Sequence, residues 1–338
     1  MPGLLDSLPE EQRGLLAAAR PGTELAERPM LATLSDRRDF PDTGEWIFER
    51  KLDGVRLLAV REAGRVTLLS RTGRRLDDSY PEIVEALSAQ SCADFTVDGE
   101  VVAFSRGRTD FARLQQRMGL TRRQEIEATG VAVTYYVFDL LRLDGADTTR
   151  LPLRLRKSLL RRALSYRAPL RWTSHRNAGG AETLAAACAR GWEGLIAKRA
   201  DRPYQPRRSP DWLKLKCSQG QEFVVGGFTE PAGSRVGLGA LLLGYHQDGK
   251  LRYAGKVGTG FDRATLLSLR ERLDRLRVDG SRFEGPVREA RARWVRPELV
   301  AQIDFTEWTR DGMLRHPRFL GLRDDKKPAD VVRERPAA

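Results

Sequence analysis

Short apolar runs separated by polar turns make up much of the first two thirds of the chain, and segments with apolar residues at helical spacing lie between them. Runs of this kind predict β-strands, and the helical spacing predicts amphipathic helices. Strands and helices mixed in this way favour an α+β fold. The expected strands cover residues 46–48, 55–60, 66–69, 95–104, 131–141, 194–198 and 212–216, and the expected helices cover residues 81–89, 109–118, 153–165 and 181–190.

The pattern changes near Gly220, where short strands separated by glycine-rich turns become dominant. Such strands with one helix among them predict a small β-barrel of the OB type. The expected strands cover residues 222–229, 240–245 and 251–258 and resume near Trp294 and Ile303, and the expected helix covers residues 262–277. We therefore divide the chain into an N-terminal arm over residues 1–28 with a helix over 10–20, a first domain over 29–220, an OB-type domain over 221–332 and a tail over 333–338.

Composition and charge narrow the classes of protein to consider. Of the 338 residues, 41% are hydrophobic and 31% are charged, which is usual for a soluble globular protein. No apolar run approaches the ~20 residues of a membrane span, and residues 1–30 contain no secretory signal, so we expect a cytoplasmic protein. The net charge of +13 indicates a polyanionic partner, although a solvated basic surface is the alternative explanation.

The cysteines and histidines are few. Cys92, Cys188 and Cys217 lie far apart in the sequence, so we expect neither a thiolate zinc site nor a disulfide framework. Cys188 lies in an alanine-rich helical stretch and is expected to be a small core residue. The histidines have no metal-binding spacing. We expect any metal to be held mainly by oxygen ligands, which favours Mg²⁺ or Mn²⁺.

Residues 49–56 match the pattern E-x-K-x-D-G-x-R, with Lys51 at its centre. A lysine can attack a nucleotide phosphate only as the neutral amine, whereas an unperturbed lysine has a pKa of about 10.4. Burial, neighbouring cations and a bound metal would lower that pKa. Arginine could not take this role because its guanidinium stays protonated. The alternative is a surface lysine before an Asp-Gly turn.

Further motifs follow Lys51 along the chain, and each alone also fits a plain structural role such as a turn, a core strand or a solvated strand face. They are S-R-T-G around Arg71, D-G-E ending at Glu100, Y-Y-V-F-D-L-L around Phe138, E-G-L-I-A-K from Glu193 to Lys198, W-L-K-L-K with Lys214 and Lys216, and the segment with Arg323, Asp325 and Lys326. Lys214 and Lys216 share one face of a strand, and two adjacent ammonium groups repel unless an anion lies between them.

These motifs, taken in this order, resemble the nucleotidyltransferase superfamily of ATP-dependent DNA ligases and mRNA capping enzymes. The resemblance is strongest to the ligase module of bacterial ligase D, an end-joining enzyme, and it runs from Pro29 to about Val332. It implies an adenylation domain of antiparallel sheets with flanking helices, followed by an OB-fold barrel.

The resemblance also implies a role for each matching residue. Lys51 would be the catalytic nucleophile, Glu49 would meet adenine, and Phe138 would stack on it. Glu100 would bind the ribose, and Glu193 would bind the metal, with Glu100 and Asp53 as further candidate ligands. Arg56, Arg71, Lys198, Lys214 and Lys216 would line the phosphate site, and Arg323, Asp325 and Lys326 would orient the departing pyrophosphate.

The activity implied is ATP-dependent sealing of nicked or broken duplex DNA through a lysyl-AMP intermediate, in DNA repair by end joining. The expected partners are DNA, a Ku-like end-binding protein and a separate polymerase and nuclease, and the enzyme is expected to be a nucleoid-associated monomer. One alternative is a capping-type RNA guanylyltransferase that uses GTP. Another is a basic DNA-binding repair scaffold without catalytic activity.

Overall fold

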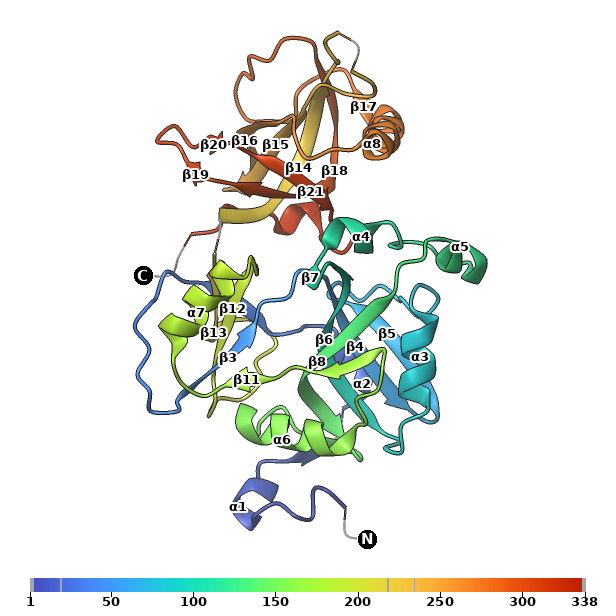
Figure 1. Ribbon diagram of the computed structural model, residues 1–338, viewed down its shortest axis with the longest axis vertical. Coiled ribbons are helices and arrows are strands. Elements are labelled where there is room, and N and C mark those ends of the chain that lie inside the picture. The colour runs from blue at the N-terminus through green and yellow to red at the C-terminus, as the bar shows by residue number, and fades with distance from the viewer. Residues whose placement is uncertain (1–2, 19, 218, 234, 336–338) are drawn as a thin grey trace. The chain divides into compact units, whose positions relative to one another are not determined.

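The computed structural model describes residues 3–18, 20–217, 219–233 and 235–335, and it divides the chain into two compact units (Figure 1). The first unit runs to Cys217 and the second from Ser218 to Arg335. The first unit contains α1 (Glu10–Arg13), β1 (Ala17–Ala18), α2 (Gly22–Ala26), β2 (Leu31–Leu34), β3 (Trp46–Arg50), β4 (Val55–Glu62), β5 (Arg65–Ser70), α3 (Pro81–Ser88), β6 (Phe95–Ser105), β7 (Arg108–Thr109), α4 (Phe111–Gln115), α5 (Arg123–Ala128), β8 (Val133–Leu143), β9 (Ala146–Asp147), α6 (Leu153–Ala163), β10 (Leu170–Trp172), β11 (His175–Arg176), α7 (Gly180–Ala189), β12 (Gly194–Arg199) and β13 (Arg208–Lys216).

The larger sheet of the first unit follows the strand order β1-β9-β8-β6-β4-β5. Its central strands pair antiparallel, and β10 joins β8 in parallel. Helices α3, α4 and α6 pack on β5, β6 and β8. Because both faces of these strands are covered, their side chains are almost continuously apolar and buried, as in the run from Val133 to Leu143.

The smaller sheet follows the order β11-β3-β12-β13-β2, with α7 packed on β12 and β3. Strand β12 pairs antiparallel with β3 on one side and with β13 on the other. A compact apolar cluster joins the two sheets, since it combines Leu58 of β4 and Phe138 of β8 with Trp212 of β13. The arrangement brings β12 and β13 against β8, where Lys198 and Trp212 lie beside Phe138.

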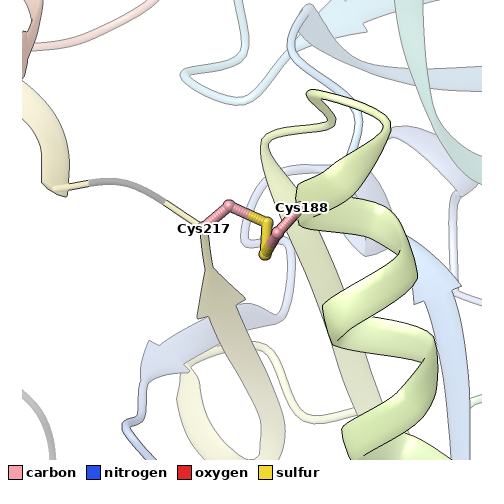
Figure 2. Close-up of a disulfide and its surroundings, with 2 residues drawn as sticks. All are labelled: Cys188 and Cys217. Atoms are coloured by element: carbon pink, nitrogen blue, oxygen red, sulfur yellow. A yellow bond between two sulfur atoms is a disulfide. The ribbon is translucent and has the colours of Figure 1, made fainter.

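A disulfide joins Cys188 of α7 to Cys217, which lies directly after β13 (Figure 2). The two Cα atoms are 5.2 Å apart although the residues are 29 positions apart in the sequence. The expectation that Cys188 is a buried core residue and that the cysteines form no disulfide is therefore wrong. Cys188 lies on the exposed face of α7, and β13 returns beside it only because of the sheet pairing.

The second unit is built around a curled antiparallel sheet with the strand order β16-β15-β14-β18-β17, and β21 also pairs with β18. Its core contains the inward side chains of these strands and three leucines of α8. The elements of this unit are β14 (Gln219–Thr229), β15 (Leu241–Gln247), β16 (Lys250–Val257), α8 (Arg263–Arg275), β17 (Arg277–Val278), β18 (Ala292–Phe305), β19 (Glu307–Trp308), β20 (Leu314–Arg315), β21 (Arg318–Leu322) and the 3-10 turn Pro328–Asp330.

The predicted α+β class is confirmed, with mainly antiparallel sheets in both units; the parallel pairs are β10 with β8 and β13 with β2. The helix predicted over residues 10–20 is wrong in extent, because α1 ends at Arg13 and Ala17–Ala18 instead pairs with β9. Residue 19 of that prediction lies outside the described residues, as do residues 336–338 of the predicted tail. Over the described ranges, no helix combines the length and the apolar character that crossing a membrane requires.

Candidate active site

Lys51 lies immediately after β3, at the point where the two sheets of the first unit approach each other. Its backbone N–H donates to the carbonyl oxygen of Gly194 at 2.9 Å, which continues the β3–β12 pairing. Its Nζ forms an ion pair with Oε1 of Glu193, and both side chains remain partly exposed, at 18% and 25%. The residue is therefore anchored by its backbone, and its side chain is partly exposed.

The glycines of two motifs are required by close backbone approach. A Cβ at Gly54 would lie 2.1 Å from the carbonyl oxygen of Val101, and a Cβ at Gly194 would lie 2.0 Å from that of Leu215. Real Cβ atoms do not approach so closely, so no other residue fits either position without moving a strand. These glycines let the segments that carry Lys51 and Glu193 lie against neighbouring strands.

The pKa of Lys51 is raised, contrary to the expectation from the sequence. Burial by itself lowers this pKa, but the Glu193 carboxylate and the negative charges of Asp53 and Glu100 together more than offset it. In this structure the lysine is thus held as the ammonium ion. Any reaction at Nζ first requires that the Lys51–Glu193 ion pair opens.

Glu193 fits the role of a ligand for a hard cation. Its second carboxylate oxygen, Oε2, is buried and has no hydrogen-bond partner among the described residues. A buried carboxylate oxygen without a partner is costly, and Mg²⁺ or Mn²⁺ prefers such oxygens. The described part of the chain contains no group of three His, Cys, Asp or Glu side chains that could hold a metal. Glu193 thus suits a cation held by few protein ligands, with water or phosphate oxygens completing its shell.

Arg56 forms a second charged element of the site. Its guanidinium makes a two-pronged ion pair with Asp98, a fully buried residue of β6. Burial lowers the pKa of Arg56, but the Asp98 carboxylate, with smaller contributions from Tyr204 and Glu100, more than offsets this effect, so the pKa is raised. The hydroxyl of Tyr204 also donates to Asp98, at 2.7 Å. The Arg56 guanidinium lies over the ring of Phe138, with 4.6 Å between Cζ and the ring centroid.

Glu49 and Lys198 form a buried ion pair, with 2.7 Å between Oε2 and Nζ. The other oxygen of Glu49 accepts a hydrogen bond from Lys157 of α6. The Lys198 ammonium lies 4.2 Å from the ring centroid of Phe138 and 4.0 Å from that of Trp212. Glu49 therefore has both oxygens engaged by cations, and Phe138 has cations against its ring.

The remaining predicted residues of the first unit lie on neighbouring strands. Glu100 is paired in register with Arg56, and its charge acts on Lys51. Lys214 and Lys216 are opposite Ile196 and Gly194 of β12, and both are partly exposed. Arg71 follows β5, at the start of the turn that closes on Gly73. The sheets thus gather charged motif residues around the ends of β3, β6, β12 and β13.

The three residues of the C-terminal motif belong to the second unit and are paired within it. The guanidinium of Arg323 binds the carboxylate of Asp325 through bonds of 2.9 and 2.8 Å, and both side chains are buried. Nζ of Lys326 lies 3.0 Å from a carboxylate oxygen of Glu222 on β14. These residues therefore lie in the second unit, whereas Lys51 lies in the first.

Sequence reasoning missed Lys157 as a residue of the site. Helix α6 carries Leu153, Arg156, Lys157 and Leu160 at the spacing i, i+3, i+4 and i+7, which is the spacing of a buried helix face. The presence of two basic residues, Arg156 and Lys157, at core-facing positions of that helix could have indicated buried ion pairs. Asp98, Trp212 and Tyr204 carry no comparable signal, because their roles arise from contacts between distant strands.

Comparison with known proteins agrees with this geometry. The profile of the family described as "ATP dependent DNA ligase domain" matches residues 29–216, and that of "ATP dependent DNA ligase C terminal region" matches residues 234–326. The multifunctional non-homologous end joining protein LigD of Pseudomonas aeruginosa is 39% identical over 98% of this chain. The chain spans only 40% of the length of that relative.

Two further relatives are matched over nearly their whole length. DNA ligase C1 of Mycolicibacterium smegmatis is 32% identical, with 90% of this chain and 92% of that protein covered. A solved structure described as mycobacterial DNA ligase D complexed with ATP and MES is 36% identical, covers 92% of this chain and 99% of its own, and has a TM-score of 0.66. The chain belongs to the family of ATP-dependent DNA ligases, with an adenylation domain followed by an OB-fold domain.

Proposed function

We propose that this chain seals breaks between a 5′-phosphate and a 3′-hydroxyl in duplex DNA by way of AMP bound covalently to Lys51. The observation that carries the proposal is the arrangement at the end of β3. There the partly exposed side chain of Lys51 contacts Glu193, whose second oxygen has no hydrogen-bond partner within the described part of the chain, and neighbouring strands carry further cationic side chains. This is the arrangement expected of a nucleophile that attacks a phosphate anion.

The reaction proceeds in three transfers. Nζ of Lys51 attacks the α-phosphorus of ATP, a nitrogen–phosphorus bond forms, and the bond to pyrophosphate breaks. An oxygen of the DNA 5′-phosphate then attacks the same phosphorus and releases the lysine. Finally the 3′-hydroxyl attacks the activated 5′-phosphate, a phosphodiester forms, and AMP leaves.

The residues of the pocket support these steps by charge and position. Lys51 has to lose a proton before it attacks, which requires that its ion pair with Glu193 opens. Arg56, Arg71, Lys198, Lys214 and Lys216 supply positive charge for the phosphates, and Glu49 and Phe138 are assigned to adenine. Mg²⁺ or Mn²⁺ held by Glu193, with Asp53 and Glu100 as further candidates, would neutralise the charge that develops on the phosphoryl group. Arg323, Asp325 and Lys326 are assigned to the departing pyrophosphate.

The decisive experiment combines labelled nucleotides with a nicked duplex. We expect wild-type protein to take label from ATP and not from GTP, and to seal the nick, and we expect Lys51→Ala to do neither. Label from GTP would support a capping-type guanylyltransferase instead. Nick binding by wild-type protein without any covalent label would support a non-catalytic scaffold, and either result would refute the proposal.

The charge of +13 supports a DNA substrate, because lysines and arginines release counterions from phosphates. We expect sealing of a nick to fall steeply as salt rises, with log rate roughly linear in log salt concentration. The measurement is the sealing rate at enzyme concentrations below saturation. A flat response would contradict electrostatic binding of the duplex.

The pathway is proposed to be repair of double-strand breaks by end joining, as in the name of the Pseudomonas relative. A Ku-like end-binding protein and a separate polymerase and nuclease are the proposed partners of a monomeric, nucleoid-associated enzyme. Stimulation of end sealing by purified Ku is the expected result. Equal sealing with and without Ku, together with no complex in a pull-down, would remove this assignment and leave the ligase activity intact.

A further inference from the structure

Lys157 is a buried cation that the proposed reaction leaves without a role. It lies on α6 with 1% of its surface exposed. Its Nζ donates to Oε1 of Glu49, to the backbone carbonyl of Thr173 at 3.0 Å and to that of Phe138 at 3.5 Å. Trp172 lies beside it, with its ring centroid 5.0 Å from Nζ. All three ammonium protons are thus accepted by fixed oxygens.

The acceptors of Lys157 belong to both sheets of the first unit. Glu49 lies on β3 of the smaller sheet, whereas Phe138 lies on β8 of the larger one. Lys157 therefore links the two sheets by hydrogen bonds to Glu49 and Phe138, close to the position of Lys51. Since Glu49 precedes Lys51 by two residues, a shift of the Glu49 carboxylate would move the end of the strand that presents the nucleophile.

Stability of the fold alone would not require a lysine at position 157. An apolar side chain of similar volume often stabilises a protein as well as a buried ion pair does, because it avoids the cost of removing charges from water. The neighbouring Arg156 is equally buried on α6, but it pairs with Asp139 and does not contact Glu49. The helix thus carries two buried ion pairs, and the one made by Lys157 includes Glu49, which is two residues from Lys51.

We propose that Lys157 is a positioning residue for AMP transfer, which holds the Glu49 carboxylate and the end of β3 in register with Phe138 and Lys198. This inference rests on the proposed function of Lys51. It assigns Lys157 no contact with ATP. Its effect passes through Glu49, whose other oxygen is bound by Lys198.

The ionisation of Glu49 provides an observable by which this role can be tested, namely the pH dependence of AMP transfer. The titratable groups that face Glu49 are the ammonium groups of Lys157 from α6 and Lys198 from β12, and the imidazole of His175, which is opposite Glu49 in the register of β11 and β3. Burial raises the pKa of Glu49, but the two ammonium groups lower it more strongly, so the carboxylate stays charged. Loss of Lys157 removes one of those groups, and Glu49 then takes up a proton at a higher pH.

The experiment measures AMP transfer from ATP to Lys51 across pH in wild type, Lys157→Met, Lys157→Arg and the matched control Arg156→Met. We expect Lys157→Met to slow the transfer by about tenfold to a hundredfold. The fall in rate on the acid side should move to higher pH, and Lys157→Arg should recover much of the loss. Arg156→Met should lower the melting temperature by a similar amount but keep the wild-type pH profile.

A double-mutant cycle covers the case in which a single variant fails to fold. If Lys157 acts through Glu49, Glu49→Gln with Lys157→Met should be no slower than Glu49→Gln alone. The inference would be overturned if the losses in AMP-transfer rate of the two variants were additive. It would also be overturned if Lys157→Met kept the wild-type pH profile and lost no more rate than Arg156→Met. Absence of AMP transfer in wild type would instead refute the proposed function, so the two failures are distinguishable.

Discussion

The disulfide between Cys188 and Cys217 should contribute measurably to the stability of the first unit. The bond joins residues 29 positions apart. In the chain-entropy model, closing a loop of this length in the unfolded chain stabilises the folded state by about 3 to 4 kcal/mol. The loop contains Glu193 and Lys198, and the N–H of Cys217 donates to the Glu193 carbonyl at 3.0 Å. The constraint therefore acts on a segment that carries part of the site.

The perturbation is the double substitution Cys188→Ser and Cys217→Ser, and the assay is urea unfolding with and without a thiol reductant. Oxidised wild type should exceed the double variant by about 3 kcal/mol in free energy of unfolding. Reductant should bring wild type down to the double variant and leave that variant unchanged. Cys92→Ser, at the free cysteine, is the matched control and should keep the full response to reductant. A response below about 1 kcal/mol in wild type would refute the loop-closure reasoning.

Further predictions concern charged groups around the site. Since Glu193 raises the pKa of Lys51, AMP transfer from labelled ATP should accelerate as pH rises. Glu193→Gln should move this increase in rate to lower pH. An unchanged pH profile in that variant would contradict the ion pair. Burial and the Lys157 charge lower the pKa of His175 from 6.5 to about 4. Between pH 4 and 6.5 the imidazole therefore binds a proton in the unfolded chain but not in the folded chain. The free energy of unfolding should fall as pH drops from 6.5 to 4, and His175→Gln should reduce this dependence on pH. Replacing Arg56 with Met leaves the buried Asp98 carboxylate without its cation, which should cost about 3 to 5 kcal/mol in urea unfolding. A loss below about 1 kcal/mol would contradict the cost expected for a buried carboxylate that has lost its cation.

Local sequence predicted the strands of both units well, because alternating or continuous apolar runs leave little choice of structure over a few residues. The strand predicted over residues 194–198, for example, is β12. The N-terminal helix failed for the opposite reason. Residues 14–18 have helical composition, but Ala17–Ala18 gains more from pairing with β9, which is more than 120 residues away in the sequence.

The sequence by itself determined the fold class and the family and predicted Lys51 as the nucleophile, because motif residues and their order are properties of the chain. Only the tertiary structure decided how the charges combine. It set Glu193 against Lys51, buried Lys157 beside Glu49 and joined Cys188 to Cys217. The physical reason is that ionisation and disulfide pairing depend on distance and burial in space. Strands that are far apart in the sequence fix both when they pair.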